Sequence, residues 1–253
     1  MARYQIILAY DGTEFFGSQR QAKVRTVQGD FEKALQKIGW RDSSVLIAGR
    51  TDAGVHASGQ VVAFDFDWKH NLNDLRNALN ATLPAELAVS SVKIAPDEFH
   101  PRFDATARLY RYRIFCQETR DPLRERFMWR VKPALDGEIL NKLAEMLPGK
   151  HDFSAFGSPP RPGGSTERHL MQASWRKQAD EWIFEVEANA FLYHMVRKLV
   201  FKQVMVAQHK VDVEKFAQSL ANQAEITSGI APPNGLTLVE VSYPDNLKFI
   251  SKI

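Results

Sequence analysis

The chain of 253 residues has a single cysteine, Cys116, so it cannot form an internal disulfide bond or a cysteine-cluster metal site. Without a disulfide framework we expect a reducing, cytoplasmic location. No stretch approaches the ~18 consecutive apolar residues that a membrane helix needs. The short apolar stretch at the start is broken by Asp11 and is too short for a signal sequence. We therefore expect no contact with a membrane.

Several motifs that would indicate a cofactor or a covalent nucleophile are also missing. The sequence has no dinucleotide-binding fingerprint, no P-loop and no G-x-S-x-G nucleophile motif. His151 adjoins Asp152, and His56 follows Asp52 by four residues, but no second pair of ligands stands at a compatible spacing. We expect neither a cofactor nor a metal site.

The charge balance leaves the type of partner open. The chain has 33 Lys+Arg and 30 Asp+Glu, a formal net charge of +3, which is too small to indicate a nucleic-acid-binding protein and does not exclude one. A near-neutral total can still hide a basic surface for RNA, because the basic residues gather in three clusters. These clusters are Arg20, Lys23 and Arg25; Arg108, Arg111 and Arg113; and Arg120, Arg124, Arg126 and Arg130.

Hydrophobic periodicity predicts alternating strands and helices. Strands are expected at 3–10, 59–67, 88–95, 108–116, 171–188 (two strands around Asp180) and 235–243. Helices are expected at 26–39, with Thr26 as N-cap, and at 72–84, 136–149, 190–207 and 211–222. This order predicts an α+β protein built from two related sheet-plus-helix halves, residues 1–104 and 105–253. The seam at 99–107 lacks the composition of a flexible linker, so we expect the two halves to pack tightly.

The segment AGRTDAGVHASGQ (48–60) is the strongest indication of chemistry. It places Arg50, Asp52 and His56 among glycines between a helix and a strand, where a rigid scaffold often presents functional residues. The alternative is a glycine turn with a capping aspartate and a solvated arginine.

Two further segments combine aromatic and basic residues. In the strand at 108–115, Tyr110 and Tyr112 share one face and Arg111 and Arg113 the other, a pattern that suits nucleic acid but also occurs in ordinary strands. In the helix at 190–207, His194, Arg197 and Lys198 form a polar edge. A lone arginine on an apolar helix is more often solvated or salt-bridged than catalytic, and His194 is likewise more often structural.

Eight collinear blocks resemble the tRNA pseudouridine synthase A family over about residues 3–244. They are YDGTEFFGSQRQ (10–21), TVQGDFEKAL (26–35), AGRTDAGVHASGQVVAF (48–64), ALNATLP (78–84), FHPRFDATARLYRYRI (99–114), HDFSAF (151–156), NAFLYHMVR (189–197) and PPNGLTLVEVSYP (232–244).

The resemblance implies a fold and a reaction. The two halves would be ferredoxin/RRM-like and share a continuous, mostly antiparallel sheet, with the active-site cleft between them. The reaction converts uridine to pseudouridine at positions 38–40 in the anticodon stem-loop of tRNA. It breaks the bond from ribose C1′ to N1 of uracil and rejoins C1′ to C5, so it needs no cofactor. The resemblance also implies a homodimer with tRNA spanning both subunits.

The resemblance also assigns roles to individual residues. Asp52 would be the catalytic aspartate, which attacks C1′ or C6 or takes a ribose proton; the sequence leaves these alternatives open. Tyr110 would be a second catalytic residue: its ring would stack on the flipped uracil, and, as a hypothesis, its hydroxyl would assist removal of the C5 proton. Arg197 would be the active-site arginine that keeps Asp52 ionised. Further contacts to the RNA are implied for Arg50, His56, Gln19, Arg20, Gln21 and Lys198.

Three positions depart from the family pattern. Ser18 stands where the family usually has tryptophan, Lys198 where it has asparagine, and Phe201 where it has glycine. We expect Phe201 to displace a neighbour, because overpacking costs typically about 1–3 kcal/mol. These departures motivate the alternative of a non-catalytic tRNA-binding or chaperone protein with the same fold. A hydrolase that uses Asp52 and His56 is a third hypothesis.

Overall fold

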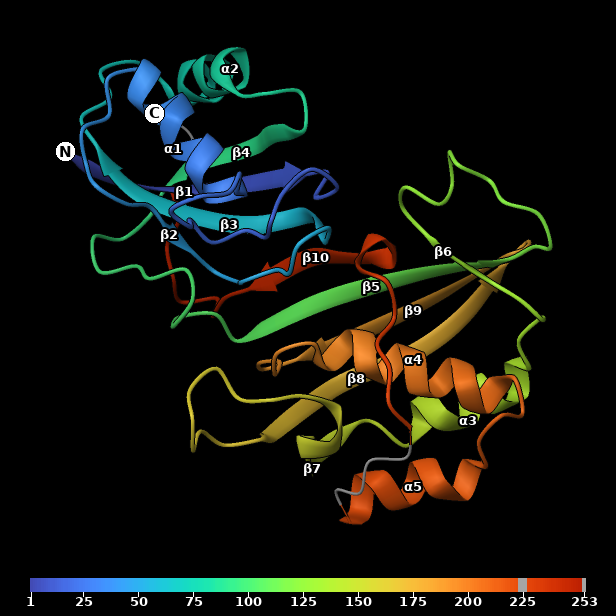
Figure 1. Cartoon of the computed structure of the whole chain (residues 1–253). Coiled ribbons are helices and arrows are strands. Elements are labelled where there is room, and N and C mark those ends of the chain that lie inside the picture. Colours follow the sequence, from blue (N-terminus) through green and yellow to red (C-terminus); the bar gives the residue numbers. More distant parts are fainter. Residues whose placement is uncertain (223–226, 252–253) are drawn as a thin grey trace. The chain divides into compact units, whose positions relative to one another are not determined.

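The computed structural model describes residues 1–222 and 227–251 (Figure 1). Within these ranges the chain forms ten strands and five α-helices, and most strand pairs are antiparallel, so the predicted α+β class is confirmed. Contacts divide the chain into two compact units, Met1–Thr106 with Leu238–Ile253, and Ala107–Thr237. No helix in the described ranges combines the length and the apolar character needed to cross a membrane.

The first unit is a sheet covered on one face by two helices (Figure 1). Strand β1 pairs antiparallel with β3 on one side and with β4 on the other, and β10 follows β3. The strands are β1 (Ala2–Tyr10), β2 (Leu46–Ile47), which pairs with β3, β3 (His56–Phe66), β4 (Leu87–Ile94) and β10 (Leu236–Ser242). The helices are α1 (Val27–Lys37) and α2 (Leu72–Thr82).

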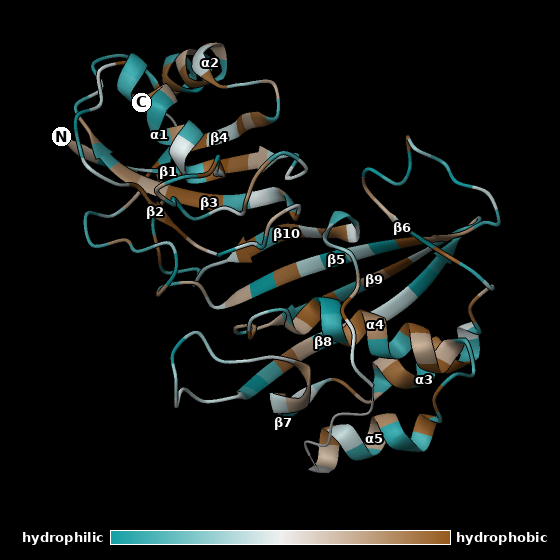
Figure 2. Cartoon of the chain, viewed as in Figure 1, coloured by the Kyte–Doolittle hydropathy of each residue, from teal (hydrophilic) through white to brown (hydrophobic). Residues whose placement is uncertain are grey.

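Helix α1 forms where the sequence predicts it. The Thr26 hydroxyl caps the helix by accepting the Gly29 N–H at 3.2 Å. Residues at helical spacing, Phe31 and Leu35 among them, are fully buried against the sheet, and the Phe31 ring lies 6.0 Å from that of Phe64 in β3. Both helices of the unit alternate hydrophobic and hydrophilic bands along their length (Figure 2).

The C-terminal segment also belongs to the first unit. The Tyr243 hydroxyl donates to the Pro101 carbonyl at 2.7 Å, and the rings of Phe99 and Phe249 meet edge to face at 5.2 Å. The chain therefore returns after residue 237 to the unit in which it began.

The second unit is a sheet with three helices that pack on one another (Figure 1). Strands β5, β9, β8 and β7 pair antiparallel in that order, and the short β6 runs parallel to β5. The strands are β5 (Ala107–Cys116), β6 (Trp129–Val131), β7 (Gly149–Asp152), β8 (Glu167–Gln178) and β9 (Glu181–Ala188). The helices are α3 (Gly137–Glu145), α4 (Met195–Ala207) and α5 (Val213–Asn222), with 3₁₀ turns at Ser154–Phe156 and Pro233–Gly235.

The predicted helix at 190–207 is wrong in its first five residues. The Tyr193 N–H donates to the Ser158 carbonyl at 2.9 Å, and His194 adopts a left-handed φ of 63°, so the helix starts only at Met195. Leu192 is buried although it precedes the helix, and it stands four residues before the buried Val196. This spacing resembles one face of a helix, which explains the wrong prediction. The sequence also missed β2, β6 and β7, because two to four residues are too few to show an alternation.

Candidate active site

The loop between β2 and β3 carries Arg50 and Asp52. Arg50 is exposed and Asp52 is half-buried. The Val55 N–H donates to the Asp52 carbonyl at 3.2 Å, which closes a turn just before β3 begins. The predicted loop is therefore present, and it leads directly into the sheet.

A second loop, residues 11–18, holds the backbone around Asp52. Thr51 and Ser18 exchange two hydrogen bonds, and the Gly54 N–H donates to the Phe15 carbonyl at 3.2 Å. Gly17 has a φ of +97°, and a Cβ there would lie 2.9 Å from the Thr51 carbonyl oxygen. Only glycine allows this conformation together with this close approach. The backbone is thus fixed on both sides of Asp52.

A buried polar cluster supports the same loop from below. The Tyr10 hydroxyl and the Thr51 hydroxyl lie 2.8 Å apart, and the Gln60 amide bonds both the N–H and the C=O of Gly49. Burial raises the pKa of Tyr10 to about 12, so its hydroxyl stays neutral at ordinary pH. This cluster was not singled out in the sequence, although all its members lie within the recognised blocks.

His56 is the first residue of β3 and is buried. Its Nδ1 lies 3.0 Å from the Gly12 N–H, which it can accept, and 3.2 Å from an Asp11 carboxylate oxygen. These contacts tie the start of β3 to the end of β1. The implied contact of His56 with RNA stays a prediction.

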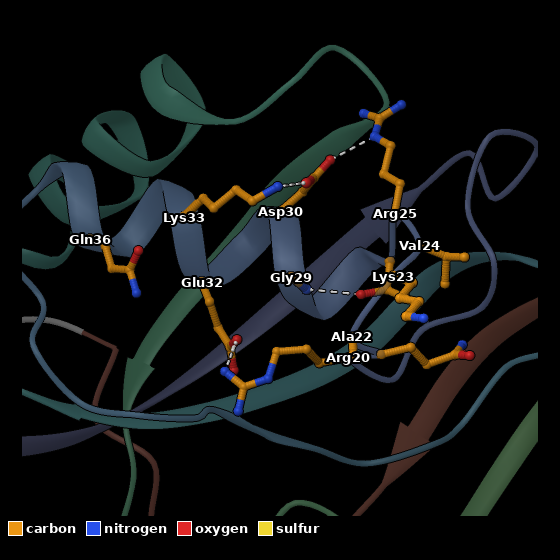
Figure 3. Close-up of a pocket in the computed structure, with 12 residues that line it drawn as sticks. Arg20, Ala22, Lys23, Val24, Arg25, Gly29, Asp30, Glu32, Lys33 and Gln36 are labelled. Atoms are coloured by element: carbon orange, nitrogen blue, oxygen red, sulfur yellow. Dashed lines mark hydrogen bonds and ion pairs between the residues drawn. The ribbon is translucent and has the colours of Figure 1, made fainter.

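The loop that follows residue 18 lines a pocket of about 500 Å³ with the first turns of α1 (Figure 3). Gln19, Arg20 and Gln21 are all exposed. Arg20 donates to a Glu32 carboxylate oxygen at 2.7 Å, and the Gln21 amide donates to the Phe16 carbonyl at 2.8 Å. The three residues are therefore displayed on a loop that its own side chains hold in place.

Glu32 on α1 is the buried anchor of this loop. One of its carboxylate oxygens accepts the Val45 N–H at 3.0 Å and the Gln28 amide at 2.9 Å, and the other accepts Arg20. The side-chain oxygen Oε1 of Gln28 in turn accepts the backbone N–H of Arg20 at 3.0 Å. One helix face thus connects the basic loop to the segment that enters β2.

Tyr110 lies in β5 of the second unit and is 8% exposed. Its ring meets the Phe191 ring edge to face at 5.1 Å. The predicted alternation of β5 is confirmed: Tyr110 and Tyr112 are buried, while Arg111 and Arg113 on the other face pair with glutamates of β9. The strand therefore presents tyrosines to one side only.

Arg197 lies in the first turn of α4 and is half-buried. Its Nε donates to the Ala231 carbonyl at 2.8 Å, and the Ala231 N–H donates to the Arg197 carbonyl at 3.2 Å. The next residue, Pro232, accepts the Tyr112 hydroxyl at 2.7 Å. Residues 231–232 therefore link α4 to the tyrosine face of β5. Lys198, the next residue of α4, is half-buried.

Phe201 packs against Trp129 and Gly229. Its ring stacks on Trp129 with centroids 6.4 Å apart and an interplanar angle of 14°. On another side it occupies the place where a Cβ on Gly229 would stand, and Gly229 has a φ of +143°. The missing side chain at 229 supplies room for the Phe201 ring. The displacement of a neighbour relative to the family stays a prediction.

Many of the predicted RNA-facing arginines pair with acids. In the second and third clusters, carboxylates lie within 2.6–3.0 Å of a guanidinium nitrogen of Arg111, Arg113, Arg120, Arg124 and Arg130. These acids offset the local positive charge, which the sequence clusters had overstated. Cys116 is half-buried, and burial raises the pKa of its thiol, so the thiol stays protonated at neutral pH.

Within the first unit, hydrogen bonds connect the loop of Arg50 and Asp52 with the loop of Gln19, Arg20 and Gln21. Within the second unit, Arg197 bonds Ala231 and the neighbouring Pro232 bonds Tyr112, which lies on the same face of β5 as Tyr110. The sequence analysis did not identify the residues that position these loops, which are Tyr10, Thr51, Gln60, Gln28 and Glu32, and it noted Ser18 only as a departure from the family pattern. In the described ranges no group of three or more His, Cys, Asp or Glu side chains could hold a metal ion.

Comparison of the whole sequence with known protein families identifies the class of protein. A family model described as tRNA pseudouridine synthase matches residues 6–104 and 143–244. The chain belongs to this family.

The curated relatives narrow the comparison. The chain is 39% identical to tRNA pseudouridine synthase A of Chloroflexus aurantiacus over 98% of this chain and 91% of the relative. It is 38% identical to the enzyme of that name from Colwellia psychrerythraea, over 97% of this chain and 95% of the relative. It is 37% identical to the one from Escherichia coli, over 96% and 91%.

A solved structure also aligns, but weakly. A chain from a crystal structure of a Cbf5–Nop10–Gar1 complex matches with a TM-score of 0.39 at 10% identity, covering 93% of this chain and 48% of that chain.

Proposed function

We propose that the protein isomerises uridine to pseudouridine at positions 38–40 in the anticodon stem-loop of tRNA. The target base is flipped out of the stack, the C1′–N1 bond breaks and C1′ bonds to C5. The proton on C5 leaves to water and N1 gains one, so atoms balance without a cofactor. Asp52 is the catalytic carboxylate, Tyr110 stacks on the uracil and Arg197 is the active-site arginine.

The observation that carries this proposal is the fixed backbone around Asp52 in a chain of this family. A carboxylate that must approach a sugar–base bond needs a defined position, because small displacements cost large factors in rate. The two hydrogen bonds between Ser18 and Thr51 and the close approach at Gly17 supply that position. Arg50, His56, Gln19, Arg20, Gln21 and Lys198 are proposed to contact the RNA.

A non-catalytic tRNA-binding protein is the second proposal, and it was motivated by the departures at Ser18, Lys198 and Phe201. Two of these departures have an evident place in the structure. Ser18 bonds the backbone beside Asp52, and Phe201 fills the space left at Gly229. These contacts favour the enzyme over a chain that has lost its active site.

The partners are proposed by the same reasoning. tRNA is the substrate, two copies of the chain form a homodimer that the tRNA spans, and the cytoplasm is the location.

Release of tritium from tRNA labelled at C5 of uracil tests the reaction, because uracil loses this hydrogen only if the base is rejoined through C5. We expect release by the wild type and none by Asp52→Asn. Absence of release by the wild type, with tRNA binding intact, would establish the non-catalytic alternative. Equal release by both proteins would remove Asp52 from the mechanism.

A further inference from the structure

Phe16 is a large apolar side chain on the loop that holds Asp52, and it is 60% exposed. Its neighbour Phe15 is 2% exposed, so the loop already has a buried aromatic anchor and does not need Phe16 for its core. An exposed phenylalanine is common on protein surfaces and by itself needs no explanation. The surroundings of Phe16 give it a more specific meaning.

The backbone of Phe16 is held on both sides. Its N–H donates to the Arg25 carbonyl at 2.9 Å, and its carbonyl accepts the Gln21 amide at 2.8 Å. The next residue, Gly17, lies against the backbone of Thr51 and Asp52. Phe16 is therefore displayed from a fixed backbone between the loop of Asp52 and the basic loop at 20–25.

The residues around Phe16 fit a polyanion better than an apolar partner. Four cations, Arg20, Lys23, Arg25 and Lys33, line the pocket that adjoins this loop, against two acids, Asp30 and Glu32 (Figure 3). Glu32 pairs with Arg20, and Asp30 pairs with Arg25 and Lys33, so the lining keeps an excess of positive charge. An aromatic ring next to cations is the combination by which proteins bind unpaired nucleotides: the ring stacks on a base while the cations bind phosphates.

We propose that Phe16 is a stacking platform for an unpaired nucleobase of the tRNA, next to the uridine that the enzyme isomerises. This inference rests on the proposed function and adds a second aromatic contact to that of Tyr110. Phe16 acts in binding and takes no part in the bond rearrangement. Its contact keeps the unpaired strand in place while the target base is out of the stack.

Affinity for an unmodified tRNA transcript, measured by filter binding with the full chain, tests the proposal. We expect Phe16→Ala and Phe16→Leu to weaken binding about tenfold, which is about 1.4 kcal/mol, because stacking on a base needs a ring. Phe16→Tyr keeps the ring and should bind like the wild type. Phe16→Ala should raise KM with little change in kcat. Wild-type affinity for Phe16→Leu would overturn the proposal.

Anticodon stem-loop RNAs with one abasic nucleotide each identify the stacked base. For one of these RNAs, Phe16→Ala should lose no further affinity relative to wild type. An equal loss of affinity against every RNA would overturn the stacking. A change in the sedimentation of Phe16→Ala without RNA would overturn it too, since Phe16 would then be a contact between subunits. Tritium release by the wild type reports separately on the reaction, so stacking without turnover and turnover without stacking are distinguishable.

Discussion

Ser18 and Thr51, 33 residues apart, exchange two hydrogen bonds: the Ser18 N–H donates to the Thr51 carbonyl at 3.1 Å, and the Thr51 N–H donates to the Ser18 Oγ at 2.9 Å. Both residues are buried, so water does not compete for these bonds. The serine that departs from the family pattern therefore helps to fix the residue next to Asp52.

Ser18→Ala should lower kcat at least tenfold with little change in tRNA affinity. The substitution leaves the buried Thr51 N–H without its acceptor, which should also lower the free energy of unfolding by about 1–3 kcal/mol. Initial rates of tritium release and urea unfolding measure the two effects. Ser43→Ala at an exposed serine is the control, and equal rates for Ser18→Ala and wild type would contradict this role.

Alkaline unfolding should reveal the buried hydroxyl of Tyr10. Its pKa is raised to about 12 in the folded protein against about 10 when unfolded, so its contribution to stability is complete below pH 10 and is lost as pH rises to 12. The loss amounts to about 2–3 kcal/mol. Tyr10→Phe should remove this part of the fall in unfolding free energy between pH 10 and 12. Tyr193→Phe, at an exposed tyrosine, should leave the fall as in the wild type.

Phe201 and Gly229 should behave as a coupled pair. Phe201→Ala should cost about 1–2 kcal/mol of unfolding free energy, because the stack of two half-buried rings, Phe201 and Trp129, is lost. Gly229→Ala should cost at least as much, since its Cβ would overlap the Phe201 ring and its φ is +143°. In the double variant Phe201→Ala/Gly229→Ala the overlap disappears and only the backbone strain at position 229 persists. The loss of unfolding free energy in the double variant should therefore be smaller than the sum of the losses in the two single variants. Strict additivity would exclude the contact.

Glu32→Gln should loosen the basic loop without unfolding the unit. The neutral amide loses the charged bond to Arg20, which should lower the unfolding free energy by about 1–3 kcal/mol. If Arg20 and Gln21 contact the RNA, KM should rise while kcat stays close to the wild-type value. Glu14→Gln on an exposed residue is the matched control. A fall in kcat alone would show that Glu32 acts on the Asp52 loop instead.

The salt dependence of tRNA binding should separate paired from unpaired cations. In the described part of the chain, no acid forms an ion pair with the exposed Lys23, whereas Arg120 pairs with Glu125 at 3.0 Å. Lys23→Gln should reduce the slope of log affinity against log salt by about one, as for the loss of one phosphate contact. Arg120→Gln should leave the slope unchanged. The reverse result would place the RNA on the loop of the second unit.

Much of the fold was predictable because the responsible forces are local. The Thr26 cap, the buried face of α1 and the alternation of Tyr110 and Tyr112 with arginines all follow from residues a few positions apart. The predicted helix at 190–207 failed at its start, because a long-range bond from Tyr193 to Ser158 overrides the local apolar spacing.

The sequence by itself determined the family, the α+β class and the residues of the recognised blocks, since each is expressed in local patterns and their order. Only the tertiary structure decided how the departures fit and where the charges are neutralised. Ser18 meets Thr51, Phe201 meets Gly229 and Arg111 meets Glu185 across 33, 28 and 74 positions of the chain. No local pattern encodes such pairs, because they form only when folding brings distant segments into contact.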